Sequence, residues 1–294
     1  MKRIAGAALA VIAAAALYAA AVPDGKRWWS YVEALANDDM KGRNTGSAEH
    51  LKAAEYVAAE FARMGLKPAG ERGFIQPVKF KGRKLVESGC SLELIRSGKA
   101  EHLTLGEDAI IGVRVDPADS VEAPLVFAGY GLVVPEARFD DFAGLDVRGK
   151  IIVTIAGGPS DIAPPLKSHY QFAGERARFL SQAGVAGVVT IQNPRSADIP
   201  WSRMATARFQ EAMSLADTAL SDDAGLKIGV TMNPEHADRW FAGSGHDLKE
   251  LLALVDAGKP LPRFPLRPTL RAKVKVERRD LESQWESGRA AMPR

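Results

Sequence analysis

The spacing of apolar residues changes once along this chain, near Phe74, and this change most restricts the fold. Before Phe74, apolar residues recur at helical spacing, which predicts helices over 26–40 and from a cap at Ser47 to a stop at Gly65. After Phe74, short β-rich runs alternate with Gly, Pro and Asp turns. A chain that opens with helices and continues mainly with strands is predicted to be α+β.

The later elements follow from the same patterns. We expect strands over 74–80, 90–95, 109–115, 124–128, 150–155, 185–191, 226–232 and 270–276. Helices are expected over 172–183, 234–241 and 247–257.

Composition excludes several classes of protein. Hydrophobic residues make up 46% of the chain and charged residues 26%, which is typical of a globular protein. Cys90 is the single cysteine, so a disulfide scaffold is excluded. It lies in an alternating, strand-like stretch without basic neighbours. We therefore interpret it as a small buried side chain and not as a reactive thiol.

The charge balance does not favour nucleic-acid binding. Lys2 and Arg3 account for two of the 39 basic residues, which leaves 37 against 36 acidic residues in the rest of the chain. The one local excess lies in 259–294, with ten basic and four acidic residues, and a solvated strand face explains it. Nucleic acid is therefore not an expected partner.

The first 21 residues have the three parts of a secretory signal peptide. Lys2 and Arg3 precede the uncharged run Ile4 to Ala21, which is mostly Ala and ends in small residues. We expect cleavage before Val22 and a periplasmic or extracellular protein. The alternative is a retained membrane anchor, since 18 residues can just span a bilayer.

Motifs in two parts of the chain resemble a known family. Residues 34–47, with the break Gly42-Arg43-Asn44-Thr45-Gly46-Ser47, then 53–61 and 64–70, resemble the opening of exported zinc-dependent aminopeptidases, peptidase family M twenty-eight. Residues 126–131, 139–142, 146–151 and 183–188 look like the protease-associated (PA) domain that such enzymes carry as an insertion.

The resemblance implies a specific domain organisation. It predicts a signal peptide over 1–21, the N-terminal helical part of an incomplete α/β zinc-aminopeptidase domain over 22–84, a PA-like β-rich domain with flanking helices over 85–265, and a return strand with a tail over 266–294. The opening helices would then leave an exposed apolar patch, with Trp28 and Trp29 on the first helix and the stripe of Phe61 on the second.

The resemblance also implies two zinc ions, held in full-length relatives by a His-x-Asp pair, a Glu-Glu pair and later Asp and His ligands. This sequence contains no Glu-Glu pair. We therefore expect no catalytic residue, no metal ligand and no cofactor in this chain, while the substrate-binding residues stay unknown. The peptide or protein substrate of the full-length relative remains the expected partner.

His236-Ala237-Asp238 fits His-x-Asp by letters only. It follows Asn233-Pro234 at the start of a polar helix, where side chains two residues apart diverge by about 200°. The remaining histidines, His50, His102, His169 and His246, are isolated in sequence and are interpreted as structural.

Three further motifs are better explained as turns. Gly243-Ser244-Gly245 lacks the strand-to-helix setting of a nucleophile elbow. Gly157-Gly158-Pro159-Ser160 follows a strand but lacks the lysine of a phosphate-binding loop. Asp140-Asp141 offers too few oxygens for a cation site.

Two functional hypotheses remain. The first is the non-catalytic N-terminal and PA-domain portion of an exported zinc aminopeptidase-like protein. The second is a stand-alone periplasmic binding or interaction module. Under the first hypothesis, the departure from the family pattern after Glu282-Ser283 indicates a frame shift or early stop near Ser283, which would have removed the catalytic half.

Export is tested by mass. If 1–21 is a cleaved signal, the intact mass of the exported protein should correspond to a chain that begins at Val22. A product that keeps Met1 to Ala21 in the membrane fraction would contradict cleavage.

Overall fold

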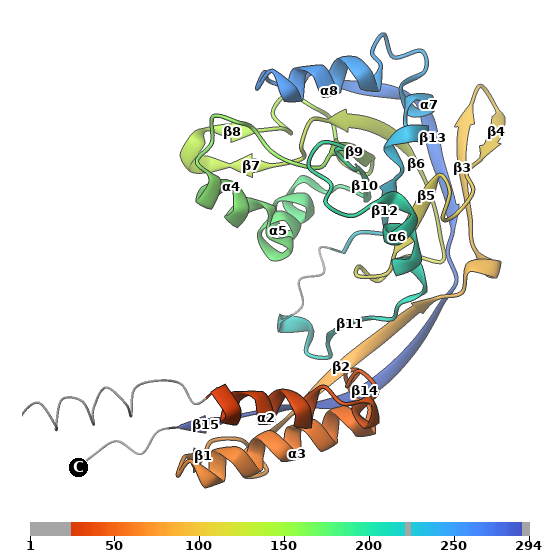
Figure 1. Ribbon diagram of the computed structural model, residues 1–294. Helices are drawn as coiled ribbons and strands as arrows, with labels where there is room; N and C mark the ends of the chain where they lie inside the picture. Colours follow the sequence, from red (N-terminus) through yellow and green to blue (C-terminus); the bar gives the residue numbers. More distant parts are fainter. Residues whose placement is uncertain (1–24, 221–224, 290–294) are drawn as a thin grey trace, which may run out of the picture. The chain divides into compact units, whose positions relative to one another are not determined.

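The computed structural model describes residues 25–220 and 225–289, so the predicted signal segment lies outside the described residues (Figure 1). The described chain forms two compact units, one of 25–79 with 282–289 and the other of the residues between 80 and 281. The chain passes from one unit to the other within strand β2 (Ile75–Leu85) and again within strand β14 (Val276–Glu286).

The smaller unit begins with two helices. Helix α2 spans Gly25–Leu35 and α3 spans Ala48–Arg63, with the 3-10 turn η1 (Asp38–Met40) between them. Ser47 caps α3 as predicted, because its hydroxyl accepts a hydrogen bond from the His50 N–H at 3.0 Å. The predicted helix over 26–40 ends five residues early, because the chain forms the 3-10 turn η1 instead and Lys41 has a left-handed backbone conformation.

Strand pairing completes the smaller unit. β1 (Lys67–Pro68) pairs antiparallel with β15 (Gly288–Arg289), and Phe61 of α3 packs edge-on against Phe74 at 6.0 Å between ring centroids. Gly46 N–H donates to the Ser283 hydroxyl at 3.1 Å, and Ser283 is buried. Beyond Ser283, where the sequence departs from the family pattern, β14 continues to Glu286 and pairs with β2.

An eight-stranded sheet forms the larger unit. Its order is β4-β3-β13-β6-β9-β10-β12-β5. The strands are β3 (Ser91–Arg96), β4 (Lys99–His102), β5 (Ala109–Gly112), β6 (Ser120–Ala128), β9 (Ile151–Ile155), β10 (Gly187–Ile191), β12 (Ile228–Met232) and β13 (Arg263–Lys273). This unit also contains β11 (Ala212–Leu215), which pairs with β2 in a three-stranded sheet of order β11-β2-β14.

The sheet is mixed. β6, β9, β10 and β12 run parallel, whereas β3, β5 and β13 pair antiparallel with their neighbours. The mixture of helices and strands was predicted, but the parallel centre was not. β13 crosses the boundary that the sequence analysis drew at residue 265 and lies inside the sheet.

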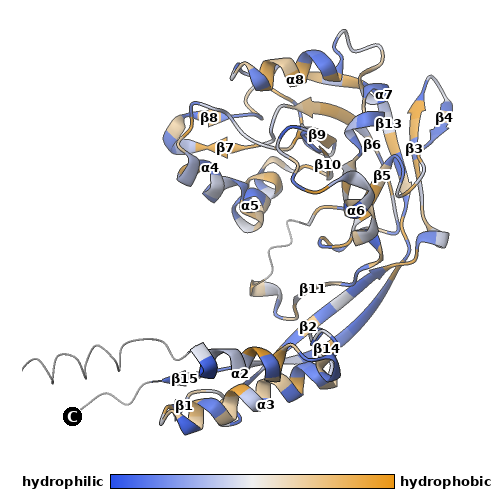
Figure 2. Ribbon diagram, in the orientation of Figure 1, coloured by the Kyte–Doolittle hydropathy of each residue, from blue (hydrophilic) through white to orange (hydrophobic). Residues whose placement is uncertain are grey.

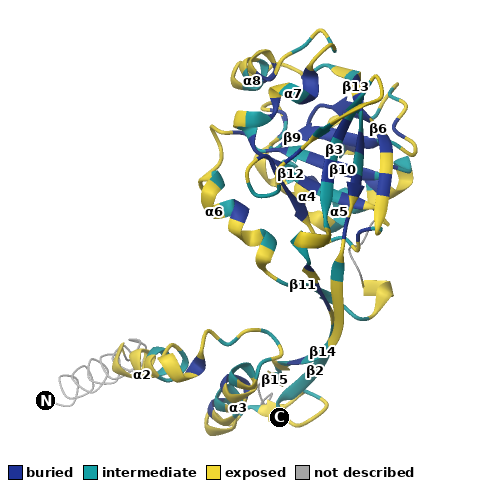
Figure 3. Cartoon of the chain, turned by 90° about the vertical axis from the view of Figure 1, so that its right-hand side faces the viewer, coloured by how far each residue is buried: buried dark blue, intermediate teal, exposed yellow. Residues whose placement is uncertain are grey.

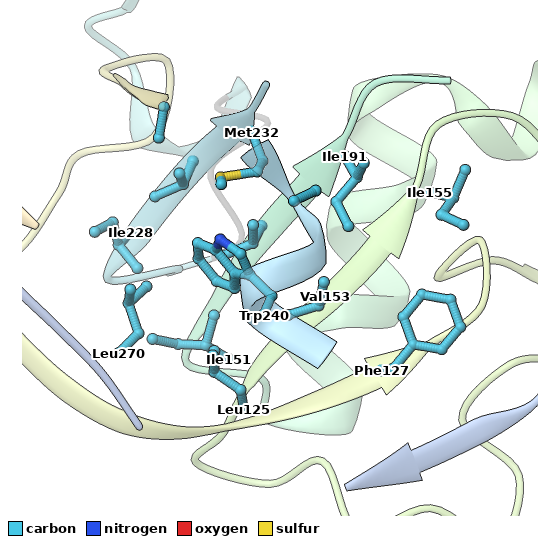
Figure 4. Close-up of a cluster of buried hydrophobic side chains, with 14 of the residues drawn as sticks. Leu125, Phe127, Ile151, Val153, Ile155, Ile191, Ile228, Met232, Trp240 and Leu270 are labelled. Atoms are coloured by element: carbon cyan, nitrogen blue, oxygen red, sulfur yellow. The ribbon is translucent and has the colours of Figure 1, made fainter. Parts of the chain in front are cut away.

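Both faces of the parallel strands are covered, which explains their continuous apolar sequences. On one face Val126, Ile152 and Val188 pack in a cluster with Leu180 of α5 (Ala173–Ala183). On the other, Phe127 and Val153 pack in a cluster with Trp240 of α7 (Asp238–Phe241) (Figure 4). Apolar colouring follows these strands in Figure 2.

The remaining elements connect or cover the strands. They are β7 (Val133–Val134), β8 (Phe139–Asp140), α4 (Pro164–Gln171), α6 (Trp201–Ala205) and α8 (Leu248–Asp256), with short 3-10 turns between them. α4 was not predicted, although Pro164 at its first position is a favourable start. The predicted helix over 247–257 is confirmed as α8, and Asp247 caps it by accepting from the Glu250 N–H. Among the described helices, none is both long and apolar enough to cross a membrane.

The two units differ in how well they are packed. α2 has no buried residue, and Trp28 and Trp29 are 62% and 54% exposed, whereas all five residues of β9 are buried (Figure 3). The predicted exposure of the two tryptophans is therefore confirmed. Phe61 is only half-exposed.

This contrast predicts the order of proteolysis. A protease should trim residues 26–70 first and leave a resistant fragment that contains the eight-stranded sheet, because local opening costs less where few apolar side chains are buried. Mass spectrometry of a limited-digestion time course would identify the fragments. Early cuts inside 150–191 would contradict this prediction.

Candidate functional site

Four parallel strands end at one edge of the eight-stranded sheet. Within two residues of its end, each is followed by a glycine or an asparagine: Gly129 after β6, Gly157 after β9, Asn193 after β10 and Asn233 after β12. Ligand sites in parallel sheets commonly form outside the carboxyl ends of the strands. We therefore take this edge as the candidate site.

The turn after β6 is held by a buried carboxylate. The Asp141 Oδ2 atom accepts hydrogen bonds from Tyr130 N–H at 3.0 Å and from Leu132 N–H at 3.1 Å. Gly129 and Gly131 have positive φ angles of 54° and 65°. A Cβ on Gly129 would lie 2.8 Å from Asp141 Oδ1, so the close approach of the carboxylate requires glycine there.

Burial changes the acidity of this carboxyl group. Asp141 is 4% exposed, and this burial raises its pKa to about 6. The hydrogen bonds from Leu132 and Tyr130 and the charge of Arg263 lower the pKa, but they only partly offset the burial. Sequence analysis had interpreted both aspartates as turn residues. Asp140 does accept from the Phe142 N–H at 2.7 Å, whereas Asp141 lies in the interior.

The Arg176 guanidinium binds the carbonyl group of the same residue, Tyr130. Arg176 Nη2 of α5 donates to the Tyr130 carbonyl oxygen at 3.3 Å and to Thr154 Oγ1 at 3.2 Å. Burial lowers the pKa of Arg176, while the charge of Asp141 acts in the opposite direction. Asp141 binds the N–H of Tyr130 and Arg176 binds its C=O, so the two charges fix the orientation of this turn.

The turn after β9 presents carbonyl groups to side chains. Gln171 Nε2 donates to the Gly157 carbonyl at 2.6 Å, and Lys167 Nζ donates to the Pro159 carbonyl at 3.1 Å. A phosphate-binding loop instead directs its backbone N–H groups at the anion. The geometry therefore agrees with the interpretation of 157–160 as a turn.

A second polar cluster lies where β12 ends. Asp108 is 5% exposed, and its Oδ1 atom is 2.6 Å from His236 Nδ1 and 3.0 Å from Arg239 Nη2. Its Oδ2 atom accepts from the Thr104 N–H at 2.7 Å. Asp238 instead accepts from the Leu248 N–H at 3.0 Å. His236 and Asp238 therefore have different partners, and the letters His-x-Asp do not describe one site.

The described residues do not fit the two zinc ions that the family resemblance implies. In the ranges 25–220 and 225–289, no three His, Cys, Asp or Glu side chains converge as metal ligands. Asp108 and His236 supply two donors, but Arg239 places a cation on the same carboxylate oxygen. A cation at this point would be repelled by the guanidinium.

The other four histidines have different partners. His50 Nδ1 is 3.3 Å from Ser283 Oγ, and the His169 ring packs edge-on against Tyr170. His246 stacks on Phe264 at 4.2 Å and faces Glu250, while His102 pairs with Glu93 across β3 and β4. Each contact supports a structural interpretation.

Cys90 and Ser244 are likewise held by backbone groups. The Cys90 thiol lies 3.3 Å from the Val86 carbonyl and from the Lys275 N–H, and burial raises its pKa. A raised pKa lowers the thiolate fraction, which is opposite to what a reactive thiol requires. Ser244 Oγ accepts from the His246 N–H at 3.2 Å within its turn.

The segments that carry the PA-domain resemblance contact one another. Residues 126–131 and 139–142 meet through Asp141 and the Tyr130 turn. Residues 146–151 and 183–188 meet because Gly149 N–H donates to the Gly184 carbonyl and Ala186 N–H to the Lys150 carbonyl, both at 2.8 Å. These segments are therefore neighbours in the folded chain.

Sequence reasoning missed three residues of these clusters. Arg176 carried a signal, because it occupies a position where the helical spacing of 172–183 calls for an apolar side chain. Asp108 and Thr154 carried none, since their partners are remote in sequence.

Comparison with solved structures finds two aminopeptidases. The chain is similar to the aminopeptidase from Aneurinibacillus sp. strain AM-1, with a TM-score of 0.44 and 20% identity over 89% of this chain and 46% of that one. It is also similar to BSAP, a zinc aminopeptidase from Bacillus subtilis, with a TM-score of 0.36 and 17% identity over 87% of this chain and 44% of that one.

This chain therefore spans less than half the length of either structure. No model of a protein family matches it, and no curated protein matches it. Because both TM-scores are below 0.5, neither similarity carries an argument about this chain's function.

Asp141 should make stability depend on pH. Its folded-state pKa of about 6 lies above the ordinary 3.8, so its contribution is fully present below about pH 4 and is lost as the pH rises through 6. The loss amounts to about 3 kcal/mol in the free energy of unfolding. D141N should lack this dependence and keep the turn, because its amide oxygen can accept both N–H bonds.

Urea unfolding of wild type and D141N between pH 4 and 8 measures the difference. D140N is the control, since Asp140 is exposed and should leave the pH dependence unchanged. Parallel curves for wild type and D141N would contradict the assignment.

Proposed function

We propose that this chain is the non-catalytic N-terminal and PA-domain portion of an exported zinc aminopeptidase-like protein. In this role, the larger unit would contribute contacts to a peptide or protein substrate. The hydrolytic zinc site would belong to residues that the chain does not supply. The periplasm or the extracellular space is the proposed location.

One observation carries the proposal. The segments that resemble a PA domain, although dispersed over 126–188, form two mutually hydrogen-bonded pairs around β6, β9 and β10. Asp141 is the clearest example. It lies in the second segment, 139–142, and its structural role depends on its contact with the first segment, 126–131. A chance match of letters would not require these segments to contact one another.

The polar clusters support a non-catalytic role. Asp141, Arg176 and Asp108 are each engaged by backbone groups or by opposite charges within the chain. A general base needs a free lone pair within reach of a substrate proton. These buried side chains instead hold turns in place, so we assign them to the framework of a binding domain.

The alternative, a stand-alone binding or interaction module, predicts different behaviour in solution. Such a module should remain monodisperse and should bind a peptide or partner by itself. A portion of a larger enzyme should aggregate or be degraded rapidly. Size-exclusion chromatography of the purified chain, followed by peptide-binding calorimetry, separates the two hypotheses.

The enzymatic test measures metal and activity together. We expect the purified chain to contain no stoichiometric zinc and to release no chromophore from aminoacyl nitroanilides, with a known zinc aminopeptidase as the positive control. H236A should not change either result, because His236 pairs with Asp108. About two zinc ions per chain, together with hydrolysis, would overturn the non-catalytic assignment.

A further inference from the structure

Helix α2 exposes two adjacent aromatic side chains. Trp28 is 62% exposed and Trp29 is 54% exposed, and their ring centroids are 6.3 Å apart. The second half of α2 is different, because Val32 and Leu35 are half-buried. Exposure of the apolar side chains is therefore concentrated in the first turns of the helix.

The apolar residues of α2 share one face. At about 100° per residue, Trp28, Val32 and Leu35 fall within about 60° of one another, and Trp29 lies at the border of the same face. Lys26 and Arg27 lie away from its centre, and Glu33 is the single acidic residue of α2. The helix is therefore amphipathic. Lys26 and Arg27 precede the exposed tryptophans in sequence, and Trp29 Nε1 donates a hydrogen bond to Glu33 Oε1 at 2.8 Å.

The sequence before α2 indicates what covers this face. The uncharged run Ile4 to Ala21 ends four residues before Gly25 and is the most continuous apolar stretch of the chain. Export brings such a run into a bilayer and leaves the residues after it at the membrane surface. Trp and Tyr are enriched at that depth, and basic residues are favoured beside anionic headgroups.

We propose that Trp28 and Trp29, flanked by Lys26 and Arg27, form a membrane-interface contact through which α2 lies on an anionic lipid surface. The tryptophan rings enter the interface between headgroups and acyl chains. The two basic side chains lie at headgroup level, where each adds electrostatic attraction. The contact belongs to α2 and does not depend on retention of residues 1–21.

A vesicle-binding experiment tests this contact on the mature form that begins at Val22. The probes are vesicles of phosphatidylcholine with and without phosphatidylglycerol, measured by co-sedimentation and tryptophan fluorescence. Binding should be stronger to the anionic vesicles. W28A/W29A should weaken it roughly tenfold or more, because both apolar anchors are removed.

W285A is the matched control, since Trp285 of β14 is 69% exposed and should leave binding unchanged. Alanine has a higher helix propensity than tryptophan, so W28A/W29A should preserve α2, which circular dichroism verifies. W28F/W29F keeps aromatic anchors and should retain most of the binding. K26Q/R27Q should weaken binding to anionic vesicles only.

Three outcomes would overturn the proposal. They are no binding to either vesicle, equal binding by W28A/W29A and wild type, or self-association that W28A/W29A abolishes without any effect of lipid. The last result would instead make this face a contact between two copies of the chain. None of these outcomes depends on zinc or peptidase activity, so the test is separate from that of the proposed function.

Discussion

The pairing of β13 between β3 and β6 is the constraint on which the larger unit depends. Leu270 of β13 pairs with Leu94 on one side and with Ala123 on the other, and all three side chains are buried. Without β13, the hairpin of β3 and β4 would have no strand to join it to the parallel centre. The pairing closes a long loop, which costs conformational entropy. Burial of a continuous apolar core offsets this cost.

The parallel centre in turn makes the Tyr130 turn possible. β6 and β9 place Gly129 and Thr154 at one edge, while α5, packed on the same strands, brings Arg176 to that edge. Asp141 reaches the turn from the other segment of the motif. Asp141 binds the Tyr130 N–H and Arg176 binds the Tyr130 C=O, so two opposite charges taken out of water hold this residue in place.

The two units differ in how completely they bury their residues. Strands β9 and β10 are covered on both faces by residues of the larger unit, so their core is complete within this chain. In the smaller unit, α3 buries only Ala53, Ala54 and Glu60, and α2 buries none of its residues. The larger unit therefore has a core of its own, whereas the smaller unit leaves apolar side chains exposed.

Local sequence determined the elements whose signals lie within a few residues. The caps at Ser47 and Asp247, the stop of α5 at Gly184 and the continuous apolar strands could be predicted because helix ends and buried strands depend on neighbouring residues. Tertiary structure alone decided the parallel order of the sheet, the central place of β13 and the burial of Asp141. It also paired His236 with Asp108, which is 128 residues away in sequence. Such long-range pairs depend on which whole faces of strands and helices are buried, and a short window of sequence does not contain this information.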